Sequence, residues 1–222
     1  MAKIETQKTI TPRAVQPPLK LLPVDESNLD ASFQEFRNQL TIAVNTFDKE
    51  FLLSVLDRKV DNGYDIEPGV NEFKKIWKLD SDTSVWKVLS GILAEGGTFN
   101  ESRTEFCGPY TVSQWDKVTR ALPEGAHTLD YVAAKGKDVP VRRDPRITAP
   151  VVATLSYDVV EYVANSQIFD PSNPGASWSK VKTSTGQEGF VLDKNLGGPM
   201  DYAACFTRKN DKWIITRLSA RE

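Results

Sequence analysis

Apolar residues recur every three or four positions near the start of the chain. Between residues 28 and 47 they are Phe33, Phe36, Leu40, Val44 and Phe47. This spacing puts all five on one face of a helix. Asn28 or Asp30 precedes the pattern and suits an N-cap, because a short polar side chain can accept a hydrogen bond from the first turn. We therefore expect an amphipathic helix whose apolar face is buried.

Three more segments show the same period. They cover residues 48–60, 67–79 and 81–97. The first has Asp48 as its expected N-cap, and the last ends at Gly96-Gly97, a helix-stop signal. The pattern predicts about four helices before residue 98.

The pattern changes at Thr98. Residues 98–115 have no helical period, and the chain then forms short apolar segments broken by glycine and proline. Two hairpins are predicted, one over residues 178–191 and one over 203–220, the latter with its turn at residues 209–211. The chain is thus helical first and β-rich second, which is typical of two structural units.

The first hairpin, "WSKVKTSTGQEGFV", carries an aromatic residue on each arm. We expect Trp178 and Phe190 to face each other from paired strands, where an aromatic pair adds about 0.5–1.5 kcal/mol beyond burial. Two interpretations stay open at this point. Both residues belong to the core, or one of them floors a ligand groove.

Several motifs around this hairpin occur in a recognisable order. They are "VPVRRDP", "APVVATLSYDVV", "WSKV" and "GQEGFV". As an ordered set over residues 132–197 they resemble a bacterial SH3-like (SH3b) domain. The resemblance implies a small β-barrel that recognises a cell-wall peptide or a protein without chemistry. The chain departs from the family pattern at Pro140, at Asp158 and in a long insert over residues 165–177.

The barrel also needs an apolar interior from alternate strand positions. Seven residues are expected to fill it: Val139, Val141, Val151, Leu155, Val160, Val181 and Val191. The predicted fold class is therefore α+β. It comprises a proline-rich extended tail (1–28), a mainly helical domain with an irregular connection (29–126), an SH3-like β-barrel (127–198) and a C-terminal hairpin that packs on the helical domain (199–222).

The composition and charge of the chain limit the classes of partner that we expect. The formal charge is −2, with 28 basic and 30 acidic residues, so a clustered basic surface for nucleic acid is not expected. No apolar run approaches the ~20 residues of a transmembrane helix. The N-terminus lacks the apolar core of a signal peptide, which fits a cytoplasmic protein or a mature exported chain. The tail is expected to be disordered or to lie along a partner.

Candidate chemistry is sparse. Cys107 and Cys205 allow one disulfide, which would tie the helical unit to the C-terminal hairpin across the barrel, or two buried free thiols. His127 is the single histidine, so neither a Cys-His nucleophile pair nor a zinc site is expected. The stretch "DNGYDIE" lacks the glycine position of a calcium loop and indicates a turn. We expect no catalytic residues, no metal and no cofactor.

Two functions remain. One is an accessory subunit of the bacterial cell envelope that docks on a larger assembly through its SH3-like domain and its tail. The other is a peptidoglycan-binding module. The departures from the family pattern and the extended tail favour the first. The expected location is periplasmic or otherwise exported, with the cytoplasm as the alternative. The expected binding residues surround the insert and are Tyr157, Tyr162, Phe169, Trp178 and Phe190.

Overall fold

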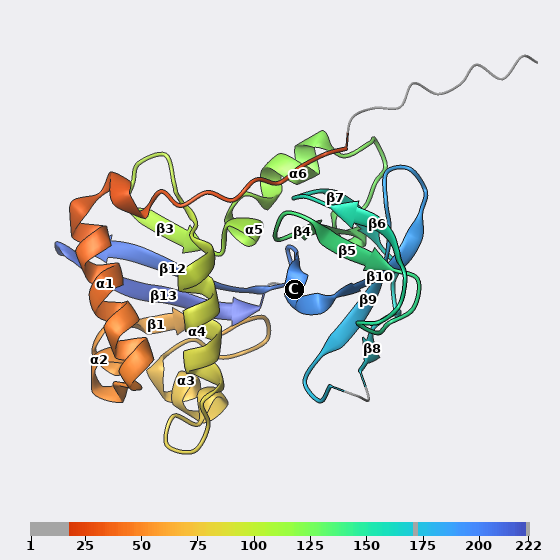
Figure 1. Ribbon diagram of the computed structural model, residues 1–222. Helices are drawn as coiled ribbons and strands as arrows, with labels where there is room; N and C mark the ends of the chain where they lie inside the picture. The colour runs from red at the N-terminus through yellow and green to blue at the C-terminus, as the bar shows by residue number, and fades with distance from the viewer. Residues whose placement is uncertain (1–17, 171–172, 221–222) are drawn as a thin grey trace, which may run out of the picture.

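The computed structural model describes residues 18–170 and 173–220 and shows a mixed α and β protein (Figure 1). Its described part contains six α-helices and two β-sheets. The α-helices are α1 (Ala31–Thr46), α2 (Lys49–Ser54), α3 (Val70–Trp77), α4 (Ser84–Glu95), α5 (Tyr110–Ser113) and α6 (Trp115–Ala121). Three short 3-10 helices are η1 (Ser27–Leu29), η2 (Thr128–Asp130) and η3 (Asp193–Asn195).

The two predicted aspartate caps are present. The side chain of Asp30 accepts a hydrogen bond from the backbone N–H of Phe33 at the start of α1. Asp48 does the same for Phe51 at the start of α2. Four of the five apolar residues expected on α1 are buried, while Phe47 ends the helix with a left-handed backbone (φ 57°) and is exposed. The apolar period therefore predicted this helix and its buried face.

The helix predicted over residues 48–60 is wrong in its second half. Helix α2 ends at Ser54, and Leu56–Asp61 forms strand β1. Its partner is β13 (Lys212–Ala220), with Leu56 opposite Ile215 in a parallel pair. Leu56 and Val60 are both buried, and their spacing of four matches a helix as well as an irregular strand. Because the partner lies some 150 residues later, local periodicity could not identify the strand.

Five strands form the first sheet, in the order β1-β13-β12-β3-β2. The remaining strands are β2 (Thr98–Phe99), β3 (Glu105–Gly108) and β12 (Tyr202–Lys209). The turn between β12 and β13 falls at Asn210 and Asp211, both with positive φ (48° and 62°), as two-residue hairpin turns of type I′ require. Residues 29–126 hold all six described α-helices and also contribute β1, β2 and β3 to this sheet, which the C-terminal hairpin completes.

One face of this sheet carries the largest core. Helices α1 and α4 cross it in Figure 1, and apolar residues of both helices and of four strands form one cluster. Phe33 is fully buried at its centre, with ring centroids 4.4 Å from Phe106, 4.9 Å from Trp213 and 5.6 Å from Phe206. The C-terminal hairpin therefore packs against α1 through aromatic contacts.

The second unit is inserted between two neighbouring strands. Strands β3 and β12 pair directly, yet residues 109–201 separate them in sequence. This insertion begins with α5 and α6, a region where we expected no helix. Tyr110, Trp115 and Val118 of these helices are buried in a cluster with Ala133 and Val159 of the second sheet. The contact with that sheet, rather than a local period, supplies the apolar environment for these helices.

The second sheet follows the strand order β11-β4-β7-β9-β10-β5-β6, with β8 paired to β9. Its strands are β4 (Tyr131–Ala134), β5 (Val139–Arg142), β6 (Val151–Leu155), β7 (Val159–Tyr162), β8 (Ile168–Phe169), β9 (Ser177–Lys182), β10 (Glu188–Leu192) and β11 (Leu196–Gly197). The end strands β6 and β11 do not pair with each other, so the described strands form no closed barrel. The expected closed barrel is corrected to a sheet whose ends stay unpaired among the described strands.

Six of the seven residues expected in the barrel interior are buried, and all six belong to one hydrophobic cluster. Val151 is the exception and is 51% exposed. It pairs with Arg142 just beyond an irregularity in the β5–β6 ladder. Such an irregularity shifts the alternation of side chains, so Val151 falls on the solvent side.

The described part of the proline-rich tail lies along this chain itself. Residues 18–26 run from the second unit to α1, along the red segment of Figure 1. Leu21 donates its N–H to the carbonyl of Tyr157, and its side chain is buried. Lys20 pairs with Asp158 at 2.9 Å, and Glu26 bonds Gly97 of the first unit. Asp158, which departs from the SH3b pattern, thus anchors this segment. The part of the expected tail before residue 18 lies outside the described residues.

Candidate functional site

A groove of about 390 Å³ opens on the second unit, beside β4, β7 and the segment after β11. Its apolar walls come mainly from six residues: Leu129, Tyr131, Tyr162, Leu196, Pro199 and Met200. Leu129 and Met200 are 42% and 44% exposed. Large apolar side chains at the rim of a concave surface are typical of a binding site for another molecule.

One polar group that lines this groove is the carboxylate of Asp193. One of its oxygens, Oδ2, accepts hydrogen bonds from Gln167 Nε2 (2.7 Å) and from the Ser177 hydroxyl. The other oxygen, Oδ1, is buried and has no hydrogen-bond partner among the described residues. Oδ1 has almost no accessible surface, so a ligand in the groove would interact with the negative charge of the carboxylate rather than bond to this oxygen.

A second carboxylate, that of Asp201, also lines the groove. Asp201 Oδ2 accepts a hydrogen bond from the N–H of Gly198 at 3.1 Å. Burial raises the pKa of Asp201 above its ordinary value, although that hydrogen bond and the charge of Lys135 act in the opposite direction. No lysine or arginine is among the described residues that line the groove. The site therefore combines apolar walls with acceptors and favours a ligand that has N–H donors next to an apolar group.

The structure brings one of the five predicted binding residues into this groove. Tyr162 lines it, and so does Gln167 at the beginning of the long insert. Phe169 is 74% exposed on β8, outside the groove lining. Tyr157 lies at the tight turn before β7, with positive φ (62°), and its carbonyl accepts the bond from Leu21. The predicted five residues therefore form no single cluster.

Trp178 belongs to the interior. It is 1% exposed, and its Nε1 donates a hydrogen bond to Asp170 Oδ2 at 3.2 Å. In the β9–β10 ladder Trp178 lies opposite Leu192, whereas Phe190 lies opposite Lys180. The expectation that the two aromatic residues face each other is wrong by two positions of register. Of the two interpretations left open for Trp178, burial in the core is the one that the structure shows.

Most residues of this groove were not predicted from the sequence. Asp193, Leu129 and Met200 were not among the expected binding residues, and Met200 lies beyond the expected end of the SH3-like unit at residue 198. The stretch Gly197-Gly198-Pro199 was the available signal, because small and rigid residues often let another chain approach the backbone. Only the fold brings these segments beside Tyr162.

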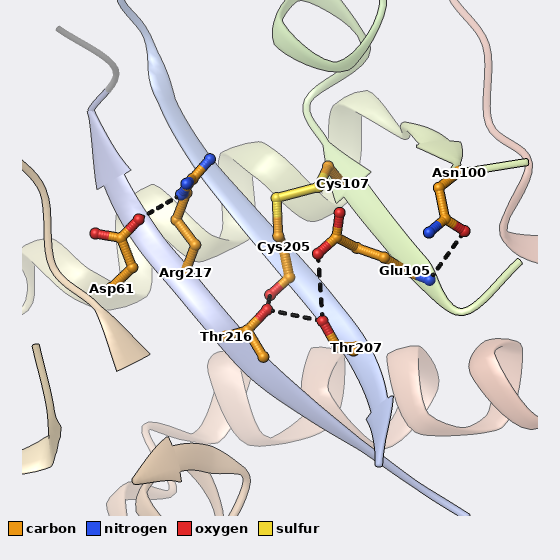
Figure 2. The surroundings of a disulfide bond; sticks show 8 residues. All are labelled: Asp61, Asn100, Glu105, Cys107, Cys205, Thr207, Thr216 and Arg217. Atoms are coloured by element: carbon orange, nitrogen blue, oxygen red, sulfur yellow. Dashed lines mark hydrogen bonds and ion pairs between the residues drawn. A yellow bond between two sulfur atoms is a disulfide. The ribbon is translucent and has the colours of Figure 1, made fainter. Parts of the chain in front are cut away.

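The open face of the first sheet holds a second candidate site, shown in Figure 2. The Sγ atoms of Cys107 and Cys205 lie 2.06 Å apart, at disulfide distance, and the two residues are directly opposite in the β3–β12 ladder. The disulfide therefore joins the two strands at the points where the chain leaves and re-enters the first unit. The pocket beside it measures about 510 Å³ and lies between the sheet and α5–α6.

Polar residues surround the disulfide on this face. Thr207 donates a hydrogen bond to Glu105 Oε2 (3.3 Å), and Arg217 Nε donates to Asp61 Oδ2 (2.7 Å). Partial burial disfavours the charged form of Asp61, but the bonds from Arg217 and from the Gly63 N–H hold its pKa below the ordinary value. Asp61 therefore forms an ion pair with Arg217, and the predicted turn in "DNGYDIE" follows this aspartate.

Comparisons with models of protein families, with curated proteins and with solved structures give no match to this chain. The groove and the disulfide face therefore have to be interpreted from their own geometry.

Proposed function

We propose that this protein is a non-catalytic interaction protein that binds an extended segment of a partner protein in the groove beside Tyr162. The observation that carries the proposal is a groove with apolar walls that the Asp193 and Asp201 carboxylates also line. Apolar walls supply affinity, and a fixed acceptor orients the ligand. A peptide with an apolar side chain and a neighbouring N–H or cationic group suits both features.

The surrounding structure supports a rigid presentation of this groove. The second unit is attached through both β3 and β12, and residues 18–26 bridge it to the first unit. Lys135 of the second unit also pairs with Glu95 of α4 at 2.8 Å. A rigid scaffold lowers the entropic cost of binding, because the site does not need to be ordered first.

An accessory role in the bacterial cell envelope is the biological setting that we propose. The SH3b resemblance of residues 132–197 supports a binding function there, and the cysteine pair at disulfide distance fits an oxidising compartment. No helix in the described part of the chain has the length and apolar character to cross a membrane. The alternative, a peptidoglycan-binding module, rests on the SH3b resemblance alone.

A matched pair of substitutions tests the groove. Met200→Glu places a charge on its apolar rim, whereas Ile147→Glu makes the same kind of change at a residue that is 55% exposed and outside the groove. Both variants should have the same Tm as the wild-type chain, since neither position is buried. Each chain is used to capture proteins from envelope fractions. A protein that the wild type and Ile147→Glu capture, but Met200→Glu does not, is purified, and its Kd for each chain is measured.

We expect Met200→Glu to weaken the interaction at least about tenfold, which corresponds to roughly 1.4 kcal/mol. Asp193→Asn should weaken it as well, because the amide removes the negative charge. Equal affinity of the wild type and all three variants for every partner would contradict the proposed site. Sedimentation of wild-type protein with isolated peptidoglycan, lost in Met200→Glu, would favour the alternative function.

A further inference from the structure

The face in Figure 2 places three metal-binding side chains together. Glu105 and Cys107 lie two residues apart on β3 and thus point to the same side, and Cys205 faces Cys107 from β12. One carboxylate oxygen and the two sulfur atoms all lie within 4.8 Å of one another. In the structure the two sulfurs are bonded to each other, so they are not thiolates.

The position of these ligands does not depend on the disulfide. Strands β3 and β12 pair at four consecutive positions, from Glu105 opposite Thr207 to Gly108 opposite Ala204. On the other face of the sheet, Phe106 and Phe206 of the same ladder are buried in the main core. These contacts keep the strand register when the sulfur–sulfur bond is opened. The Cα atoms of the two cysteines, 4.2 Å apart, would stay in place.

The chemistry of this set favours zinc. Two thiolates and one carboxylate form a set of borderline softness that Zn²⁺ accepts, whereas Ca²⁺ and Mg²⁺ prefer oxygen ligands. In a tetrahedral site with Zn–S bonds of about 2.3 Å, two sulfurs lie roughly 3.8 Å apart, a separation that side-chain rotation can supply. The adjoining pocket of about 510 Å³ leaves room for a water molecule as the fourth ligand.

We infer that the reduced form of this protein binds one Zn²⁺ through Cys107, Cys205 and Glu105, and that the disulfide and the zinc site are alternative states of the same residues. A dithiol reductant supplies two electrons and two protons, becomes a disulfide itself, and leaves two cysteine thiols. Zinc binding then displaces both thiol protons. Oxidation of the site by a disulfide compound reverses the electron transfer and releases the ion. This inference is independent of the proposed peptide groove.

The two states correspond to two environments. Disulfides persist in oxidising compartments, while thiols stay reduced in the cytosol. The chain would hold zinc where it is reduced and the disulfide where it is oxidised. In both states β3 and β12 are cross-linked beside the insertion, so the second unit stays clamped at both of its connections.

The test uses the full chain, reduced with a phosphine, separated from the reductant and titrated with Zn²⁺ by calorimetry. We expect one ion per chain. Cobalt(II) should give a thiolate-to-metal charge-transfer band and the visible bands of tetrahedral coordination. Far-ultraviolet circular dichroism follows the strands throughout. Oxidation with a small disulfide should release one zinc for every two thiols consumed.

Three variants decide the ligand set. Cys107→Ser combined with Cys205→Ser should abolish binding. Glu105→Gln should weaken it at least about tenfold, because even loss of an outer-shell partner of a metal ligand costs about 10–100-fold in affinity. Glu161→Gln, the same change on β7 of the other sheet, should leave the affinity unchanged.

The inference is overturned if the reduced wild-type chain binds zinc no more tightly than the double serine variant. Binding that is accompanied by loss of the strand signal would also overturn it, since the ion would then be held by unfolded thiols. If Glu105→Gln and Glu161→Gln bind equally well, the carboxylate is not a ligand and the proposed three-residue site is wrong.

Discussion

Gly97 offers a sharp test of how the first unit is packed. It follows α4 and directly precedes β2, where the chain passes β3. A Cβ atom added to Gly97 would lie 2.1 Å from the carbonyl oxygen of Cys107 and 2.9 Å from the Cε1 atom of Phe106. The clash involves backbone, which cannot rotate away, so Gly97→Ala has to push β2 and β3 apart.

The same substitution at Gly91 is the matched control. Gly91 lies on the exposed face of α4, and a Cβ atom there meets nothing within 4 Å. Alanine in an exposed helix interior is more stable than glycine by about 0.8–1.0 kcal/mol. The two alanines therefore differ in the sign of their effect, although they lie on the same short segment of chain and are chemically identical.

The magnitudes follow from these contacts. Overpacking costs about 1–3 kcal/mol, and contact with backbone places Gly97→Ala at the upper end, at about 3 kcal/mol. For a chain of this size 1 kcal/mol shifts Tm by about 2–4 °C. We expect Gly97→Ala to lower the Tm by about 6–12 °C and Gly91→Ala to raise it by about 2–4 °C.

Thermal unfolding followed by circular dichroism, with urea unfolding as a second measurement, checks both values. A Gly97→Ala protein with the same Tm as the wild type would refute the close approach between Gly97 and β3. A destabilised Gly91→Ala protein would show that α4 does not expose that position. Either result would require a different arrangement of α4 against the sheet.

The remaining predictions concern the cysteines, the α1 face and Asp201. Thiol counting on denatured, unreduced protein should find no reactive thiol, and reduction should lower the free energy of unfolding by up to ~4.7 kcal/mol in the chain-entropy model; two thiols without reduction would contradict the disulfide. Phe36→Asp should cost several kcal/mol because the charge enters the core without a partner, and an unchanged Tm would be inconsistent with that burial. The pKa of Asp201 is raised by burial, so its contribution to stability decreases as pH rises from its ordinary pKa through the folded value. Asp201→Asn, which keeps an acceptor for the Gly198 N–H, should therefore raise Tm at pH 7 relative to wild type, and this difference should vanish near pH ~3; a constant difference at both pH values would show that the charge is not responsible.

Local signals were sufficient for much of the secondary structure. Asp30 and Asp48 cap their helices because a carboxylate next to free N–H groups is stabilising wherever the helix is placed. The glycine pair after α4, the hairpin turn at Asn210-Asp211 and the strands of the SH3b-like motifs likewise depend on residues a few positions apart. Such features are encoded by short-range sterics and hydrogen bonds, which a single sequence displays directly.

Tertiary structure alone decided how these elements combine. Strand β1 exists because β13, far along the chain, offers it a parallel partner, and Leu56 and Val60 fit a helix equally well without that partner. The register of β9 against β10 separated Trp178 from Phe190, and the irregularity before Val151 turned that residue outward. These outcomes depend on long-range pairing, whose energy is not contained in any local window.

In the two candidate sites as well, the sequence supplied the residue types and the tertiary structure brought them together. The even cysteine count permitted a disulfide from the sequence, but only the β3–β12 pairing placed Glu105 beside it. The groove joins Leu129, Tyr162, Asp193 and Met200, which are distant in sequence and have no common motif. The sequence determined which side chains can bind and which segments form helices and strands. The fold determined which of them meet, because neighbours across a sheet are chosen by the packing of the whole chain.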